Sequence, residues 1–258
     1  MPVAIITGAS RGLGRALAAE LAGRGWDLVL DGRNAEVLRA AARELRAAGT
    51  EPPSAARAAR THLPPHADPN THPDIRPHIR DIPGDVTDPA HRAELVSAAL
   101  ALGGVDLLIN NASALGAEPL VPLAELPEAG LREALETNVT APFALIRATL
   151  PALRAAGGAV VNVSSDAAVE AYPTWGGYGA GKAALDHLSA VLAAEEPDIR
   201  VWWVDPGDLR TELYAAAVPD DADFDERTPP EQVAPEFLRL LDRKAPSGRY
   251  VAELQETR

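Results

Sequence analysis

Short, almost wholly apolar segments alternate with longer amphipathic segments along this chain. The apolar runs are Val3–Thr7, Asp27–Asp31, Val105–Asn110, Ala159–Ser164 and Ile199–Asp205, with a last strand expected near Arg249–Glu253. The segments of helical periodicity are Gly12–Gly23, Asn34–Ala48, Pro89–Leu102, Glu128–Leu153, Tyr178–Ala194 and Pro230–Asp242. Strands that are apolar along their whole length are typical of a parallel sheet covered by helices on both faces. The alternation therefore predicts a doubly wound, mostly parallel α/β fold, with residues 1–258 forming a single domain.

Composition argues against several classes of function. The formal net charge is −13, whereas a general nucleic-acid binder is more often basic. The chain has no cysteine, which excludes disulfides, thiolate chemistry and cysteine-ligated zinc within it. No apolar run approaches the length of a membrane-spanning helix, and the N-terminal residues read as a strand rather than a signal peptide. We therefore expect a cytoplasmic protein that binds neither nucleic acid nor membranes.

Residues 50–78 interrupt the alternation where a short helix-to-strand connection is expected. This segment is rich in proline, alanine and arginine and carries four histidines, His62, His66, His72 and His78. A metal site is conceivable there, but the histidine spacing is irregular and the prolines keep the backbone extended. We expect a mobile, solvated insertion and no metal site.

A glycine-rich turn follows the first predicted strand directly and opens the first predicted helix. Its sequence is Thr7-Gly8-Ala9-Ser10-Arg11-Gly12-Leu13-Gly14. Glycines in this context allow a tight turn and close approach of the backbone to a pyrophosphate, while the helix N-terminus offers N–H groups and a favourable dipole. An ordinary strand-to-helix turn would look similar, but the place in the chain favours a dinucleotide site. We expect cofactor contacts from Gly8, Ser10, Arg11, Gly12, Leu13 and Gly14.

The end of the second strand indicates which dinucleotide is bound. An acidic residue there would bind the ribose diol of NAD, whereas arginine would accommodate the 2′-phosphate of NADP. Counting from Gly14, the discriminating position falls on Gly32, followed by Arg33, with Arg11 in the nearby turn. Two cations that converge on one phosphate favour NADP(H). A register shifted by one residue would place Asp31 there instead and favour NAD(H).

Tyr178 and Lys182 lie four residues apart at the start of a predicted helix, which places them on one face about one turn apart. A phenol titrates near ~10 in water and is a poor base at neutral pH. We expect the Lys182 ammonium to lower the pKa of Tyr178 and to make it a general acid/base. A surface Tyr/Lys pair is the alternative, and it is the better interpretation if the pair is considered alone.

Hydroxyl and amide side chains follow the neighbouring strands at the same edge of the sheet. Ser165 ends the fifth strand, where a hydroxyl can donate to a substrate carbonyl oxygen. Capping of the strand end is the alternative, and it suits Ser164 better than Ser165. Pro142 has no N–H to donate to the carbonyl of Asn138, so this carbonyl could hold an ordered water or simply mark a kink.

These residues together resemble the short-chain dehydrogenase/reductase family in its compact single-domain branch. The matching pieces are Thr7-Gly8-x-x-x-Gly12-x-Gly14, Asp85 in Gly84-Asp85-Val86, Asn110-Asn111-Ala112, Asn138, Ser165, Tyr178-x-x-x-Lys182 and Pro206-Gly207 with Thr211. They occur in the family's order and cover nearly the whole chain apart from residues 50–78. The resemblance implies a seven-stranded Rossmann-type sheet. It also implies a homodimer or homotetramer that acts on a small carbonyl or alcohol substrate.

The resemblance also implies a role for each matched residue. Tyr178 would donate and accept the proton, and Ser165 would position the carbonyl. Lys182 would bind the nicotinamide ribose, and Asn138 would hold a water in a proton relay. The remaining cofactor contacts would come from Asp85 and Val86 at the adenine, from Asn111 and Ala112 along the cleft, and from Pro206, Gly207 and Thr211 at the nicotinamide.

Two features depart from the family's pattern. Ser113 stands where glycine is usual after Asn-Asn-Ala, and we expect a slightly altered turn there without loss of activity. The acid-rich segment near residues 208–228 is expected to form a mobile substrate lid, with a solvated connector as the alternative.

The sequence thus predicts an NADP(H)-dependent dehydrogenase/reductase that acts on CH–OH groups. A catalytically silent NAD(P)-binding regulatory protein on the same fold is the alternative, although it would not need Ser165, Tyr178 and Lys182 together. An epimerase or dehydratase is a third candidate, but the chain leaves little room for a larger C-terminal substrate domain.

Overall fold

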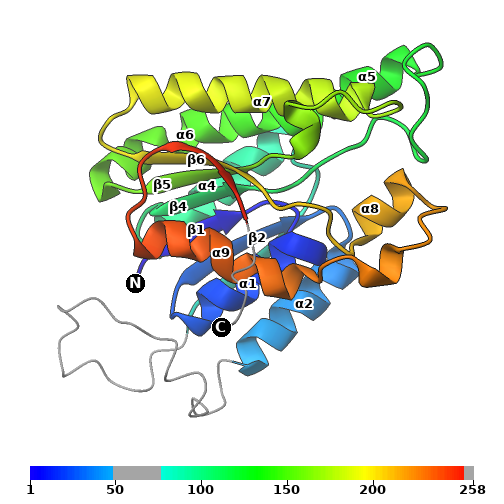
Figure 1. Cartoon of the computed structure of the whole chain (residues 1–258). Coiled ribbons are helices and arrows are strands. Elements are labelled where there is room, and N and C mark those ends of the chain that lie inside the picture. The colour runs from blue at the N-terminus through cyan, green and yellow to red at the C-terminus, as the bar shows by residue number, and fades with distance from the viewer. Residues whose placement is uncertain (49–76, 253–258) are drawn as a thin grey trace, which may run out of the picture.

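Seven parallel strands form one sheet in the order β3-β2-β1-β4-β5-β6-β7 in a computed structural model that describes residues 1–48 and 77–252 (Figure 1). The strands are β1 (Val3–Ile6), β2 (Asp27–Gly32), β3 (Ile79–Pro83), β4 (Leu107–Asn110), β5 (Ala159–Val163), β6 (Arg200–Asp205) and β7 (Gly248–Val251). The four central strands β1, β2, β4 and β5 are buried along their whole length, as their apolar sequences predict. The predicted doubly wound, Rossmann-type fold is confirmed, and every strand pairing is parallel.

Helices cover both faces of the sheet. The larger helices are α1 (Gly12–Gly23), α2 (Ala35–Ala48), α4 (Pro89–Leu102), α5 (Glu128–Leu135), α6 (Ala141–Ala156), α7 (Gly176–Glu195) and α9 (Pro230–Asp242). Figure 1 shows α1, α2 and α9 on one side of the sheet and α4, α6 and α7 on the other. Alternate residues of β1 supply the two cores, since Ala4 and Ile6 pack in the first core and Val3 and Ile5 in the second.

Local signals account for the helix boundaries. Asn34 precedes α2, and its side-chain oxygen accepts from the N–H groups of Glu36 and Val37 at 3.1 and 3.2 Å, as the sequence predicts for an N-cap. Asp88 caps α4 in the same way by accepting from Ala90 N at 2.9 Å, directly before Pro89. The predicted bounds of α1, α4 and α9 agree with the structure.

β3 is an element that the sequence analysis did not identify. It is short and carries Arg80, Asp81 and Pro83, so it lacks the continuous apolar pattern used to identify strands. Its place at the edge of the sheet explains this composition, because an edge strand tolerates charge and proline. Most of the insertion predicted at residues 50–78 lies outside the described residues. His78 is an exception, since its main-chain carbonyl accepts from Leu28 N at 2.8 Å and leads into β3.

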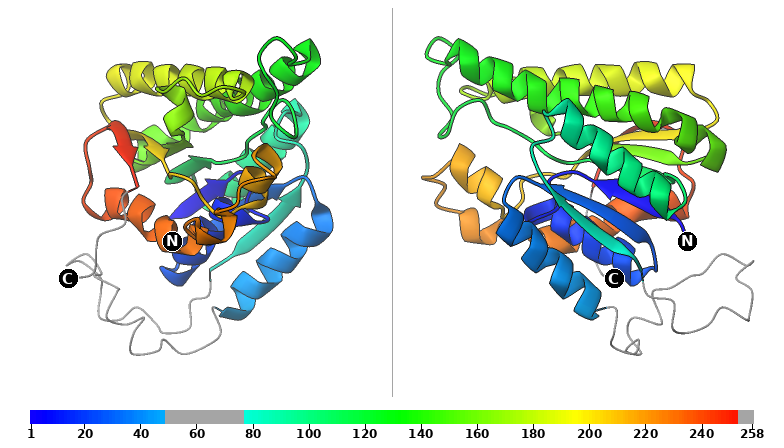
Figure 2. Two further views of the ribbon diagram at one scale, coloured as in Figure 1. Left: turned by 45° about the vertical axis from the view of Figure 1, so that its right-hand side comes forward. Right: turned by 180° about the vertical axis from the view of Figure 1, so that it is seen from behind.

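The predicted helix Glu128–Leu153 is interrupted near its middle. A π-helical turn, η1 (Glu136–Thr140), separates α5 from α6 and ends directly before the helical residues that include Pro142. Ala141 N donates to Glu136 O, five residues earlier, so the widened turn replaces the simple kink expected from proline. α5, η1 and α6 run together alongside α7 (Figure 2).

The sheet reverses its winding direction between β1 and β4. Side-chain hydrogen bonds connect the residues that follow these two strands. Thr7 Oγ1 accepts from the N–H groups of Asn111 and Ala112 at 2.9 and 3.0 Å. Asn111 Nδ2 donates to the carbonyls of Thr7 and Gly8 at 2.9 and 3.1 Å. The junction lies at the carboxyl ends of the strands, where ligands bind in open α/β sheets. No helix among the described residues is long and apolar enough to span a membrane.

Candidate active site

A cleft of about 950 Å³ lies across the carboxyl ends of the strands. Nearly all the residues predicted from the sequence to bind cofactor or substrate line it. They are Gly8, Ser10, Arg11, Gly12, Leu13, Arg33, Asp85, Val86, Asn111, Ala112, Ser165, Tyr178, Lys182, Pro206, Gly207 and Thr211. Gly14 and Asn138 are buried and do not line the cleft themselves. The fold thus gathers residues from both ends of the sequence into one site.

The glycine turn at the start of α1 is shaped for a close ligand. Gly8 has a φ of 63°, and a Cβ on Gly14 would lie 2.4 Å from Gly8 O, so a side chain fits poorly at either position. Arg11 occupies the N-cap of α1 without a side-chain hydrogen bond to the helix. The first turn of α1 therefore offers N–H groups to an anion, which fits the pyrophosphate of a dinucleotide.

Asp31 is hydrogen-bonded to other groups of the protein. Its side chain is buried, with Oδ2 accepting from Gly8 N at 3.2 Å and Oδ1 accepting from His91 Nε2 at 2.6 Å. The last residue of β2 is Gly32, where a Cβ would lie 3.1 Å from the Cβ of Ser10. Arg33 follows and is exposed at the cleft, while Arg11 pairs with Glu212 across it.

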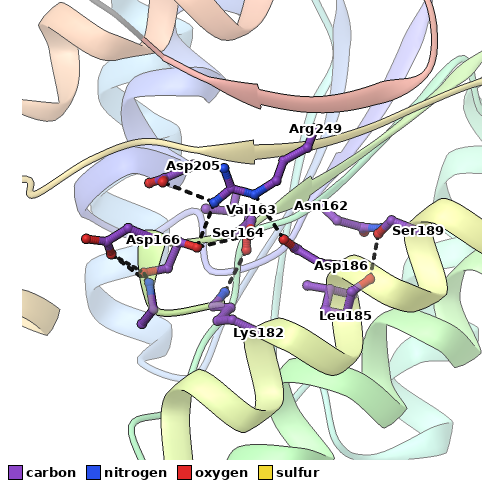
Figure 3. Close-up of polar contacts among 12 residues, drawn as sticks. Asn162, Val163, Ser164, Asp166, Lys182, Leu185, Asp186, Ser189, Asp205 and Arg249 are labelled. Atoms are coloured by element: carbon purple, nitrogen blue, oxygen red, sulfur yellow. Dashed lines mark hydrogen bonds and ion pairs between the residues drawn. The ribbon is translucent and has the colours of Figure 1, made fainter. Parts of the chain in front are cut away.

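Tyr178 and Lys182 lie together on the face of α7 that borders the cleft. Lys182 Nζ is 5.4 Å from the centre of the Tyr178 ring. It also donates a hydrogen bond to Val163 O at 2.7 Å (Figure 3). Both side chains are buried, so neither belongs to a solvated helix surface. The arrangement therefore differs from the surface pair that the sequence left open.

The pKa of Tyr178 is raised overall, so the lowered pKa expected from the neighbouring Lys182 is not the net outcome. Burial raises the pKa of Tyr178 above its ordinary value of 10.0, and hydrogen bonding with Ser165 and Ser113 offsets this only in part. The carboxylates of Asp205 and Asp166 raise it further. The phenol therefore keeps its proton at neutral pH, which suits a proton donor better than a base.

Lys182 is itself perturbed by its surroundings. Burial lowers the pKa of Lys182 from 10.5 to about 8, while the carboxylate of Asp186 raises it. The side chain is therefore mostly an ammonium at neutral pH and loses its charge as the pH rises above about 8. Beyond the bond to Val163 O, an ammonium has further N–H groups that can bind ribose hydroxyls.

Ser165 is both a cap and a cleft residue. Its hydroxyl donates to Asp166 Oδ1 at 3.0 Å and accepts from Ala167 N at 3.1 Å, which caps the short helix η2 (Asp166–Ala168). The capping role that the sequence suggested for Ser164 thus belongs to Ser165. Since the hydroxyl also interacts with Tyr178, a small rotation would let it donate to a ligand in the cleft.

Asn138 holds the loop after β4 through its side chain. Its Oδ1 accepts from Ala114 N at 2.9 Å and from Ser113 Oγ at 3.1 Å, and its Nδ2 donates to Ala114 O at 2.8 Å. The sequence analysis considered only the main-chain carbonyl of Asn138. The side-chain contacts were missed because they join residues on separate elements.

Further residues line the cleft besides those predicted to act in catalysis or to bind the cofactor. Ser113 interacts with both Tyr178 and Asn138, and Asp166 accepts from Ser165 and from the Tyr172 hydroxyl at 3.0 Å. The unusual serine after Asn-Asn-Ala was the only sequence signal for Ser113. Tyr172 and Trp175 also line the cleft, and the Trp175 ring makes an edge contact with Tyr178 at 5.5 Å between centroids.

The segment near residues 208–228 has more structure than a simple connector. It contains α8 (Glu212–Ala217) and η3 (Phe224–Glu226), and a bridge joins Leu209 to Thr228. Tyr214, on α8, lines the cleft together with Asp208. The segment therefore borders the cleft, while its role as a mobile substrate lid stays a prediction. Among the described residues, no three His, Asp or Glu side chains gather as a metal site would require.

Comparisons with known proteins agree with this geometry. The family model for short chain dehydrogenase matches residues 2–58 and 58–222. Dehydrogenase/reductase SDR family member 7B from Bos taurus is 35% identical over 254 residues, covering 94% of this chain and 71% of that protein. Sepiapterin reductase from Xenopus laevis is 34% identical over 247 residues, covering 93% of this chain and 82% of that protein.

Solved structures share the fold over nearly the whole chain. An alcohol dehydrogenase from the archaeon Thermococcus sibiricus, complexed with 5-hydroxy-NADP, is 25% identical with a TM-score of 0.79. The match covers 100% of this chain and 98% of that one. A protein from Escherichia coli CFT073, complexed with NADPH, is 26% identical with a TM-score of 0.80, over 98% of this chain and 96% of that one.

Proposed function

The chain belongs to the short-chain dehydrogenase family, and from this premise we propose that it is an NADP(H)-dependent oxidoreductase for a carbonyl or secondary alcohol. One observation carries the proposal. Tyr178 and Lys182 on α7 lie with Ser165, which follows β5, in the same cleft as the glycine turn before α1. A proton donor, a cation and a hydroxyl thus border the space that a dinucleotide would enter.

In the reductive direction, the chain's own groups handle the proton and the developing negative charge. A bound nicotinamide would supply the hydride. Ser165 would donate a hydrogen bond to the substrate carbonyl oxygen, and Tyr178 would transfer its proton to that oxygen. The raised pKa of Tyr178 suits this donor role, because the phenol stays protonated until the substrate oxygen becomes basic. Lys182 would bind the ribose hydroxyls and stabilise the phenolate that remains.

The preference for NADP(H) rests on the residues around the end of β2. The Asp31 side chain accepts hydrogen bonds from Gly8 N and His91. A Cβ at position 32 would lie 3.1 Å from the Cβ of Ser10, so there is little room for an acidic side chain in place of Gly32. Arg33 and Arg11 border the same part of the cleft and can bind a 2′-phosphate. The NADP ligands of two similar solved structures support this choice.

Replacement of Tyr178 by phenylalanine tests the proposed chemistry. We expect Tyr178→Phe to lower turnover by about 10²–10⁴-fold, the usual contribution of a general acid, because only the hydroxyl is removed. Turnover would be followed by nicotinamide absorbance with a panel of ketones and secondary alcohols. NADPH binding, measured by calorimetry, should change little because the ring remains.

Tyr250→Phe is the matched control for that variant. The Tyr250 hydroxyl donates to Pro246 O at 2.9 Å, away from the cleft, so its loss should leave turnover unchanged. Full activity of Tyr178→Phe would refute the assignment. No turnover by the unaltered protein over a broad panel, despite tight NADPH binding, would favour the regulatory alternative.

Cofactor preference has its own test. We expect Arg33→Ala to weaken NADPH binding by about tenfold or more and to leave NADH binding unchanged, since a hydrogen bond to a charged group contributes roughly 1.5–3 kcal/mol. Arg39→Ala removes the same charge from an exposed position on α2 outside the cleft and serves as the control. Equal losses for both cofactors in Arg33→Ala would exclude a 2′-phosphate contact.

Assembly and location also remain proposals. We propose a homodimer or homotetramer in the cytoplasm, as the family resemblance implies, with a small carbonyl or alcohol as the substrate. Light scattering of the purified protein would measure the mass of the assembly, and a monomeric mass would refute this part.

A further inference from the structure

A single arginine on the last strand touches three elements that build the active site. Arg249, on β7, donates through Nη2 to Ser165 O at 3.0 Å and to Asp205 Oδ2 at 3.2 Å. Its Nε donates to Asp186 Oδ2 at 3.2 Å. Figure 3 shows the guanidinium between Asp205 and Asp186, with Lys182 on the same helix as Asp186. Arg249 therefore links the end of β5, the end of β6 and helix α7.

Asp186 and Lys182 lie one turn apart on α7, which brings their side chains close together. The side chain of Asp186 is 12% exposed, and burial raises its pKa. The hydrogen bond from Arg249 and the charges of Arg249 and Lys182 offset this rise only in part. The carboxylate thus lies in a mostly buried place, where the charges of Arg249 and Lys182 favour its ionised form.

Charged groups from several elements lie in the region of Lys182. The titratable and charged groups of this region are Tyr178 and Asp186 on α7, Asp166 on η2, Asp205 at the end of β6 and Arg249 on β7. Asp166 and Asp205 act on Tyr178, whereas Asp186 is the carboxylate that acts on Lys182. A buried ammonium needs a nearby negative charge to remain ionised.

We propose that Asp186 is the counter-ion of Lys182 and that Arg249 is a positioning residue, which holds this carboxylate and the Ser165 main chain in their working places. The role of Asp186 and Arg249 in turnover rests on the proposed function, but the electrostatic interaction of Asp186 with Lys182 does not. Asp205 extends the arrangement, because its Oδ1 accepts from Gly207 N at 3.0 Å in the turn that borders the cofactor cleft.

The composition of the chain allows a direct test, because Lys182 and Lys244 are its only lysines. Isotope-labelled lysine would give two side-chain signals in nuclear magnetic resonance spectra of the full chain. Lys244 is exposed, and its signal is assigned by its loss in Lys244→Arg. In the unaltered protein we expect the Lys182 signal to titrate with a midpoint of about 8.

The two partners should shift this midpoint in opposite directions. Asp186→Asn removes the counter-charge and should lower the Lys182 midpoint by about one pH unit or more, as loss of a neighbouring opposite charge does. Arg249→Gln removes the other cation that interacts with the Asp186 carboxylate. Because this carboxylate then interacts mainly with Lys182, the Lys182 midpoint should rise. Asp198→Asn makes the same charge change as Asp186→Asn at an exposed position after α7 and should cause no shift.

The direction of the shift in Asp186→Asn separates an electrostatic role of this carboxylate from a merely structural one. Looser packing around Lys182 would admit water and move the midpoint upward in both variants. An unchanged or raised midpoint in folded Asp186→Asn would overturn the counter-ion, and a lowered midpoint in Arg249→Gln would overturn the role of Arg249. Since no turnover is needed, these results stand even if the proposed reaction fails.

Turnover measurements then test the positioning of Ser165. Arg249→Gln should lower kcat by about tenfold, because the hydrogen bond from a charged donor to Ser165 O is lost. Arg249→Lys keeps a cationic donor and should recover part of kcat, with KM for NADPH little changed in both variants. An unaltered kcat in Arg249→Gln would refute the positioning role.

Discussion

Ser113 illustrates how one residue can alter an otherwise familiar site. The position normally carries glycine in the family that the sequence resembles, yet here a hydroxyl donates to Asn138 Oδ1 and also interacts with Tyr178. Asn138 Oδ1 keeps the N–H of Ala114 as a second partner, so Ser113 can rotate without leaving a buried acceptor unpaired. The hydroxyl can therefore turn toward Tyr178 when the phenol loses its proton.

We expect Ser113→Ala to raise the pKa of Tyr178, because hydrogen bonding with Ser113 lowers it in the protein. The pH at which alcohol oxidation reaches half of its maximal rate should rise by up to about one unit, since a neutral hydrogen bond contributes about 0.5–1.5 kcal/mol. Ser113→Thr keeps the hydroxyl and should retain the original profile. Identical profiles for the alanine and threonine variants would show that the hydroxyl has no such effect.

The elements of this chain carry buried polar pairs that their periodicity did not indicate. β2 and α4 are joined by Asp31 and His91, whose side chains are 3% and 5% exposed. Asp31 also accepts from Gly8 N, so the pair connects α4 to the glycine turn. In a similar way, the side chain of Asn138 in the π-helical turn joins that turn to the loop after β4.

The Asp31–His91 pair, which joins β2 to α4, should make the free energy of unfolding depend on pH. The hydrogen bond with Asp31 raises the pKa of His91 above its ordinary value of 6.5. A histidine whose pKa is raised on folding stabilises the fold fully below about 6.5, and this contribution disappears as the pH rises through the folded pKa. We expect the free energy of unfolding, measured in urea, to fall over that range.

His91→Gln is the matched variant for this measurement, because glutamine can donate a hydrogen bond to Asp31 but does not titrate. The free energy of unfolding of this variant should therefore not fall as the pH rises over the same range. The same pH dependence in both proteins would mean that other groups cause it.

At the scale of the whole molecule, the parallel sheet brings residues from the whole length of the chain to one edge. Arg249 near the C-terminus reaches Ser165, and the glycine turn near the N-terminus faces the segment near residues 208–228. Within this segment, Arg227 binds Asp208 and Asp221 at 3.0 Å each and lies 5.2 Å from the centre of the Tyr214 ring. Arg227 thus joins several residues of this segment to one another.

We expect Arg227→Gln to loosen this segment without unfolding the molecule. Ion pairs at partly exposed positions contribute little, so the free energy of unfolding should fall by less than about 1 kcal/mol. KM for the substrate should rise several-fold, because Tyr214 and Asp208 border the cleft. Limited proteolysis with chymotrypsin would detect faster cleavage at Tyr214 and Phe224. Unchanged proteolysis and KM would show that Arg227 does not order the segment.

The amino-acid sequence by itself determined the fold class, most of the strands and helices, the glycine turn and the shared face of Tyr178 and Lys182. These features follow from local periodicity and from spacing along one helix, both of which can be read from neighbouring residues. β3 was not predicted, because an edge strand need not be apolar. The tertiary structure alone decided the Arg249–Asp186 pair, the contacts of Ser113 with Asn138, and the direction in which the pKa of Tyr178 moves. Burial and charge act through space, between residues that lie far apart along the chain, so no local pattern carries that information.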